Sequence, residues 1–87
     1  MKHIKLFYLA DCRFCKQAFS YIEQLKEQEQ YKDIEIDLIE ESEEPDISDQ
    51  YDYYFVPTFY FGDEKLSEGA VTYEEVETIF QKVLKSS

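Results

Sequence analysis

The chain has 87 residues, of which 44% are hydrophobic and 17% aromatic, and its 20 acidic and 9 basic residues give a net charge of −11. This length predicts one domain over residues 1–87, and the apolar content excludes intrinsic disorder. The charge disfavours nucleic acid and anionic membranes as partners, and no apolar run approaches the ~20 residues of a membrane span. We therefore expect a soluble, cytoplasmic monomer with no nucleic-acid or membrane partner.

The first half of the chain predicts a strand, a helix and a second strand. Residues 2–9 are almost continuously apolar, as in a central strand that is covered on both sides. Apolar side chains then recur every three or four residues from Phe14 to about Gln28, which predicts an amphipathic helix. Alternation of apolar and acidic residues over residues 34–38 predicts the second strand.

The second half predicts a short helix, a hairpin and a last helix. Pro45 suits the first turn of a helix reaching about Tyr51. Residues 58–61 and 65–67 flank a Gly-Asp turn and predict a hairpin, and a capping box at Thr72 opens an apolar stripe that predicts the last helix. The order β-α-β-α-β-β-α predicts an α/β fold with a four-stranded mixed sheet and helices on both faces.

Two cysteines, Cys12 and Cys15, lie at the junction of the first strand and the first helix. A pair three residues apart closes too short a loop to stabilise the fold. The N-terminus of a helix carries partial positive charge and free N–H groups, which favour a thiolate at the first cysteine. A thiol one turn later can attack a mixed disulfide formed there. The motif predicts thiol–disulfide exchange, with Cys12 as exposed nucleophile and Cys15 as buried resolving thiol.

Two other interpretations of the pair remain open. Both cysteines can be small apolar core residues. They can also bind zinc, but a tetrahedral site needs four ligands and His3 is the one further soft donor, so such a site needs a dimer that shares two pairs. We expect no metal and no cofactor, because the redox-active group is the Cys12–Cys15 pair itself.

A second motif, Val56-Pro57-Thr58, precedes the predicted third strand. Together with the cysteine motif after an apolar strand, it resembles the thioredoxin superfamily, and within it the small glutaredoxin-like proteins, over nearly the whole chain. The resemblance implies a glutaredoxin-type thioredoxin fold with Pro57 in the cis form beside the sulfurs. It also implies that Val56 offers backbone groups to an extended substrate and that Thr58 belongs to the same substrate-binding segment.

The chain departs from glutaredoxins at positions that contact glutathione. Arg13 and Phe14 stand between the cysteines where glutaredoxins commonly have Pro and Tyr, and Asp11 lies in the stretch where they carry a basic residue. Glu68 takes the place of the first of two paired glycines and repels an anionic ligand. We therefore expect an oxidoreductase for protein or small-molecule disulfides that is not specific for glutathione, with a thiol or a reductase as electron donor.

Aromatic residues are candidates for the surface around the cysteines. Residues 51–55 form an aromatic run directly before the proline segment, and Tyr is favoured at interfaces. We expect Tyr8 and Tyr54 to lie near the site, with core packing of part of the run as the alternative. Arg13 and Phe14 are expected to border the substrate groove.

Two further features have plainer interpretations. His3 is expected to face solvent, far from the cysteines. The stretch from Glu40 to Asp49 holds six carboxylates but lacks the spacing and glycine turn of a calcium site, so we expect a solvated loop. The competing function is a non-catalytic binding module that docks a partner through its acidic and aromatic face, with the cysteines idle or holding metal in a dimer.

Overall fold

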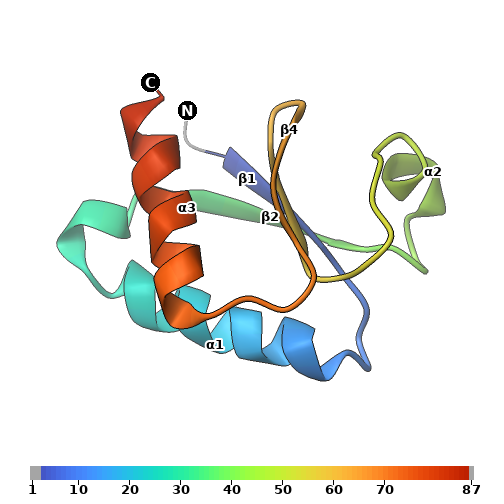
Figure 1. The fold of residues 1–87 in the computed structure, drawn as a ribbon, viewed down its shortest axis with the longest axis horizontal. Coiled ribbons are helices and arrows are strands. Elements are labelled where there is room, and N and C mark those ends of the chain that lie inside the picture. The colour runs from blue at the N-terminus through green and yellow to red at the C-terminus, as the bar shows by residue number, and fades with distance from the viewer. Residues whose placement is uncertain (1–2, 87) are drawn as a thin grey trace.

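The computed structural model describes residues 3–86, which form a four-stranded sheet with helices packed on it (Figure 1). In chain order the elements are β1 (His3–Tyr8), α1 (Arg13–Lys26), the short 3-10 helix η1 (Glu29–Tyr31), β2 (Glu35–Glu40), α2 (Pro45–Ser48), β3 (Thr58–Phe61), β4 (Glu64–Glu68) and α3 (Tyr73–Lys85). The strands lie in the order β2-β1-β3-β4. Strand β1 pairs parallel with β2 and antiparallel with β3, and β3 pairs antiparallel with β4. The predicted mixed sheet and its closing hairpin are confirmed.

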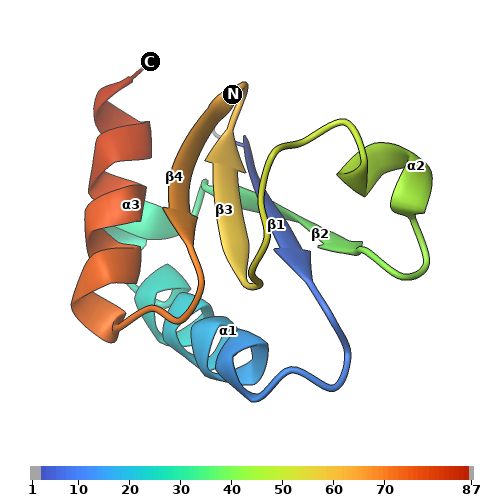
Figure 2. The ribbon, with the colours of Figure 1, turned by 45° about the vertical axis from the view of Figure 1, so that its right-hand side comes forward.

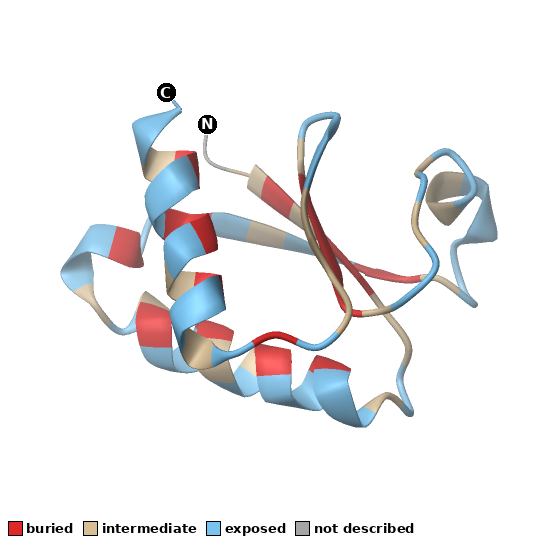
Figure 3. Cartoon of the chain, in the orientation of Figure 1, coloured by how far each residue is buried: buried red, intermediate tan, exposed pale blue. Residues whose placement is uncertain are grey.

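The larger core lies between the sheet and the helices α1 and α3, which cover the same face (Figure 2). Ile4 and Leu6 alternate along β1 toward this face, and both are fully buried. The helices meet them with apolar residues three or four positions apart, a spacing that places them on one side of each helix. These residues are Ala18, Ile22, Leu25, Val76, Ile79, Phe80 and Val83. Figure 3 shows the buried positions of both helices turned toward the sheet.

The opposite face of the sheet carries a smaller, aromatic core. Phe7 lies at its centre, with the ring centroids of Tyr51 and Tyr53 both 4.9 Å away and that of Tyr60 5.9 Å away. The helix α2 contributes only Ile47 to this core and has no buried residue. Helices do cover both faces as predicted, but α2 is shorter than predicted. The chain that follows α2 does most of the covering on this side.

The helix α1 ends at Lys26, slightly before the predicted end near Gln28, and the chain turns through η1. This turn drives Tyr31 into the larger core, where its ring packs edge-on against Phe80 with 5.4 Å between centroids. Burial of one large ring is worth about 2 kcal/mol, which is enough to end a helix whose next residues are polar. Within residues 3–86 no helix is long and apolar enough to cross a membrane.

The strand β2 runs further than predicted, and His3 is less exposed than predicted. β2 continues to Glu40 because it stays in parallel register with β1 as far as Tyr8. His3, the first residue of β1, is only partly exposed and lies between two carboxylates of β2. Its Nε2 is 2.8 Å from Glu35 and its Nδ1 is 3.5 Å from Asp37.

Candidate active site

Cys12 directly precedes α1 and caps its N-terminus. Its backbone is extended, with φ −86° and ψ 117°, and its Sγ accepts a hydrogen bond from the backbone N–H of Cys15 at 3.1 Å. An oxygen of Ser, Thr, Asp or Asn usually accepts this bond. Here a sulfur takes that place, so the free N–H groups and partial positive charge of the helix end face the Cys12 side chain.

The two thiols meet different surroundings. Both are free; Cys12 is partly exposed, whereas Cys15 is fully buried. Loss of water around Cys15 raises the pKa of its thiol to about 12, and the hydrogen bond with Cys12 adds to the rise. At neutral pH Cys15 is therefore a protonated thiol, and the accessible sulfur of the pair is that of Cys12.

The segment Val56-Pro57 lies against Cys12 although it is 44 residues away in the chain. The thiol of Cys12 donates to the carbonyl oxygen of Val56, with 3.8 Å between sulfur and oxygen. The peptide bond between Val56 and Pro57 is cis, which confirms the expectation drawn from the resemblance. Pro57 is buried, and its carbonyl oxygen accepts from the N–H of Gly69 at 2.9 Å, which ties the segment to the end of β4.

Thr58 and Tyr8, both predicted to belong to the site, are buried and partly buried, respectively. Thr58 is fully buried, and its hydroxyl donates to the carbonyl oxygen of Phe55. Its side chain therefore shapes the turn before β3 and offers no exposed surface to a ligand. Tyr8 is partly buried against Phe19 of α1, with ring centroids 5.0 Å apart.

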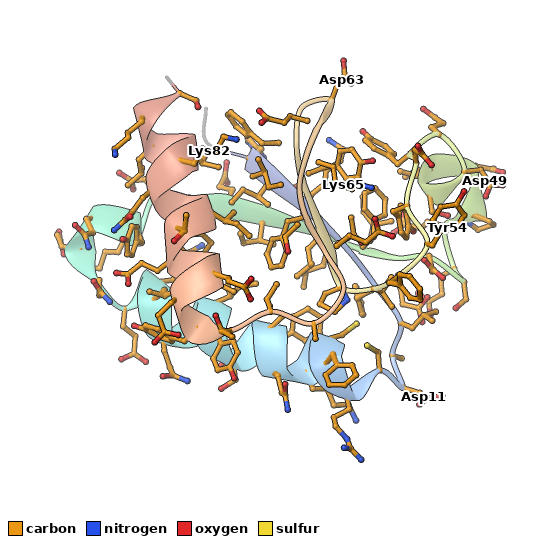
Figure 4. The ribbon with its side chains drawn as sticks, in the orientation of Figure 1. Asp11, Asp49, Tyr54, Asp63, Lys65 and Lys82 are labelled. Carbon is orange, nitrogen blue, oxygen red and sulfur yellow. The ribbon has the colours of Figure 1, made fainter. Side chains whose placement is uncertain are left out.

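The surface beside the pair is aromatic. Phe14, Tyr54 and Phe55 are 48%, 86% and 69% exposed, values that are unusual for large apolar side chains. Arg13 is also exposed, in the first turn of α1. Figure 4 shows Tyr54 and Asp11 at the same end of the molecule, on the loops that lead to β3 and to α1. Three residues predicted for the site are therefore exposed here: Arg13 and Phe14 in the first turn of α1, and Tyr54 in the loop that leads to β3.

Solved structures share this architecture at low sequence identity. Thioredoxin 1 of the thermophilic eubacterium Thermosipho africanus has a TM-score of 0.70 at 23% identity, over 97% of this chain and 96% of that one. The chain has the thioredoxin fold. The germline-specific thioredoxin Deadhead of Drosophila melanogaster has a TM-score of 0.69 at 17% identity, over 92% of this chain and 78% of that one. A malarial protein has a TM-score of 0.72 at 15% identity, over 94% of this chain and 96% of that one.

No family profile and no curated protein matches the sequence. The likeness to thioredoxins is therefore one of fold, and the chemistry has to be argued from the residues of this chain.

A buried carboxylate, Glu40, fixes the loop of this thioredoxin fold that carries Cys12. Its Oε2 accepts from the N–H of Ala10 at 3.1 Å, and its Oε1 accepts from the N–H and the hydroxyl of Ser42 at 2.7 and 2.6 Å. The Ser42 hydroxyl bond is the main cause that lowers the pKa of Glu40. The expectation of a solvated loop is wrong for this residue, because it closes the end of β2 onto the cysteine loop. No local pattern marks this residue, because its partner Ala10 is 30 positions away in the chain.

Phe14, Tyr54 and Phe55 together form an exposed aromatic rim, and a second carboxylate, Glu68, holds the part of it that Tyr54 and Phe55 form. It accepts from the backbone N–H groups of Tyr54 and Phe55, and its Oε1 lies 2.7 Å from Nζ of Lys65. The Lys65 bond, followed by the two N–H bonds, lowers the pKa of Glu68 to about 2. The sequence placed Glu68 near the site through the glycine comparison, but gave no sign that it binds the chain's own backbone.

Among residues 3–86 no three His, Cys, Asp or Glu side chains are grouped so that they could hold a metal ion. His3 lies at the start of β1 with its two carboxylate neighbours, at the far end of that strand from the loop that carries the cysteines. What the site offers chemically is a dithiol, one sulfur accessible and one buried.

Proposed function

We propose that the protein is a thiol–disulfide oxidoreductase that reduces protein or small-molecule disulfides with the Cys12–Cys15 dithiol. The observation that carries the proposal is the asymmetry of the pair: Cys12 is accessible and caps α1, while Cys15, one turn later, is buried. The thioredoxin fold and the cis Val56–Pro57 bond beside Cys12 support it. The protein acts as a cytoplasmic monomer without a bound cofactor, and a thiol or a reductase supplies its electrons.

In the first step the thiolate of Cys12 attacks one sulfur of the substrate disulfide. A bond forms between Cys12 Sγ and that sulfur, the substrate S–S bond breaks, and the other substrate sulfur leaves as a thiolate. Val56 borders the reacting sulfur and offers its backbone to the substrate main chain, as the resemblance implies. Arg13, Phe14 and Tyr54 border the same opening.

In the second step Cys15 attacks Sγ of Cys12 in the mixed disulfide. The Cys12–Cys15 disulfide forms, the bond to the substrate breaks, and the second substrate sulfur leaves. Two electrons pass from the protein thiols to the substrate, and the proton that Cys15 loses offsets one taken up by a released thiolate. Because burial keeps Cys15 protonated in the resting protein, Cys12 attacks first.

Charge at the opening disfavours glutathione as the specific donor. Glutathione is an anion, while Asp11 precedes Cys12 and Glu68 occupies the N–H groups of Tyr54 and Phe55. Like charges at close range cost about 1 kcal/mol even in water. The ammonium group of Lys65 is already paired with Glu68.

The test is the reduction of insulin disulfides driven by dithiothreitol. Wild type is expected to accelerate the reaction over dithiothreitol alone, and Cys12→Ser is expected to return it to background because no nucleophile remains. Asp63→Asn, at the tip of the hairpin between β3 and β4, serves as a control and should keep the wild-type rate. A wild-type rate equal to background, or an active Cys12→Ser variant, would overturn the proposal and favour the binding module.

A further inference from the structure

A hollow of about 380 Å³ opens beside the aromatic rim, between α2 and the segment that leads to β3. Three tyrosines, Tyr51, Tyr53 and Tyr54, line it together with the carboxylates of Glu41 and Asp49. Two serines and Pro45 complete its wall. Figure 4 shows Asp49 and Tyr54 at this end of the molecule, next to α2. The lining therefore combines aromatic rings with negative charge.

The carboxylates of this hollow have no cation of their own. The ion pairs among residues 3–86 join other groups, and none includes Glu41 or Asp49. The polar partner of Glu41 is the hydroxyl of Tyr53, which donates to its Oε1 at 2.7 Å. Burial, then this bond, raises the pKa of Tyr53, so the phenol stays neutral. A cation that enters the hollow meets two carboxylates, which attract it, among tyrosine side chains, whereas an anion is repelled.

The hollow lies beside the chain segment that leads to the cysteine site. Tyr54 is two residues before Val56, whose carbonyl oxygen lies 3.8 Å from Cys12 Sγ, and two extended residues span roughly 7 Å. Glu41, which lines the hollow, donates its backbone N–H to the carbonyl oxygen of Tyr8 at 3.0 Å, at the end of the strand that leads to the cysteine loop. A polypeptide whose disulfide lies at Cys12 can therefore extend a nearby side chain into the hollow.

We propose that this hollow binds a Lys or Arg side chain of the substrate, so that the protein selects polypeptide disulfides with a cationic residue two or three positions from the reacting cysteine. Charge complementarity argues for this occupant, because the chain carries −11 overall and the hollow holds two carboxylates that form no ion pair among residues 3–86. The tyrosine side chains add apolar surface on which the methylene stem of a Lys or Arg side chain can pack. The inference rests on the proposed oxidoreductase activity.

The test compares three synthetic peptide disulfides that differ at one position, which holds arginine, its neutral analogue citrulline, or glutamate. With dithiothreitol as reductant, kcat/KM for the arginine peptide is expected to exceed that for citrulline about three- to tenfold, since its charge meets two carboxylates. The glutamate peptide should be the slowest.

Two matched variants locate the effect. Asp49→Asn should lower the ratio of arginine to citrulline about two- to fivefold, since Glu41 remains, whereas Asp33→Asn, the same charge change at an exposed position in the turn between η1 and β2, should leave it unchanged. Equal effects of the two variants would overturn the inference, because the preference would then come from net charge. Equal rates for arginine and citrulline in wild type would also overturn it while leaving the oxidoreductase intact. No reduction of any peptide would instead contradict the proposed function.

Discussion

The cysteines differ because one turn of helix separates an accessible position from the interior. Cys12 stands before the first turn of α1, and Cys15 belongs to the stripe that faces the sheet. The sequence predicts this placement because it depends on local features, an apolar strand that ends and a helix that begins. The apolar stripe was predicted to begin at Phe14, four positions before Ala18, but Phe14 is 48% exposed and Cys15, three positions before Ala18, is buried in its place. The burial of Cys15 was therefore expected from its role as resolving thiol and not from the spacing.

The different surroundings predict selective alkylation. The rise from 9.0 to about 12 in the pKa of Cys15 lowers its thiolate fraction at pH 8 roughly a thousandfold. Iodoacetamide should therefore label Cys12 first in the folded protein. Cys15→Ser should be labelled at the wild-type rate and Cys12→Ser far more slowly, as read by intact mass against time. Comparable labelling rates of the two variants would contradict the burial of Cys15.

The residue patterns did not reveal hydrogen bonds between residues that are far apart in the sequence. Glu40 binds the backbone of Ala10, 30 positions away, and Glu68 binds that of Tyr54 and Phe55. Nothing local marks these carboxylates among the 20 acidic residues. Their partners follow from the register of β1 with β2 and of β3 with β4, which the hydrophobic pattern does not fix to the single residue.

Glu68 predicts a particular dependence of stability on pH. Its pKa falls from 4.5 to about 2 on folding, so its contribution is complete above about pH 4.5 and disappears as pH falls toward 2. Glu68→Gln should therefore lower Tm near neutral pH, and the plots of Tm against pH for wild type and Glu68→Gln should converge near pH 2.

The control for this measurement is Glu43→Gln, an exposed carboxylate outside the ion pairs of residues 3–86. It should shift Tm little at any pH. If the difference in Tm between wild type and Glu68→Gln were constant from pH 7 to pH 2, the bonds of the ionised Glu68 carboxylate would not be the cause of the lower Tm.

At the scale of elements, periodic segments were predictable and irregular ones were not. The strand at 58–61 lies where predicted, and α3 begins after Thr72 as its capping box requires. The chain around α2 was harder to predict, because Phe7 draws Tyr51 and Tyr53 into the second core by ring packing. Such packing depends on a partner that is distant in sequence. Because it draws Tyr51 out of the helix, α2 ends at Ser48, before the predicted end near Tyr51.

The capping box of α3 gives a prediction at this scale. The hydroxyl of Thr72 accepts from the N–H of Glu75 at 3.1 Å, and the Glu75 carboxylate accepts from the N–H of Thr72 at 2.8 Å. Thr72→Ala should lower the free energy of unfolding by about 1 kcal/mol, or roughly 4–8 °C in Tm. Thr78→Ala, the same change in the middle of α3, should cost less than about 0.5 kcal/mol. Chemical denaturation measures the free energy of unfolding of both variants. Equal losses would contradict a stabilising role for the capping box at Thr72.

At the scale of the whole molecule, the sheet assembles the site from the two halves of the chain. The first half supplies Cys12 at the end of β1, and the second half supplies Val56 and Pro57 before β3, which pairs antiparallel with β1. The topology was predictable from element order. That the Val56-Pro57 segment lies beside the Cys12 sulfur was expected only from the resemblance, because no pattern in either half of the chain indicates which residues of the other half it contacts.

The most direct measurement is the capture of a mixed disulfide. Cys15→Ser mixed with an oxidised peptide should accumulate a covalent adduct whose mass equals protein plus one peptide half, because Cys12 attacks and nothing resolves the product. Cys12→Ser under the same conditions should form none, and dithiothreitol should reverse the adduct. An adduct on Cys12→Ser in place of Cys15→Ser, or on neither, would contradict the assignment of Cys12 as nucleophile.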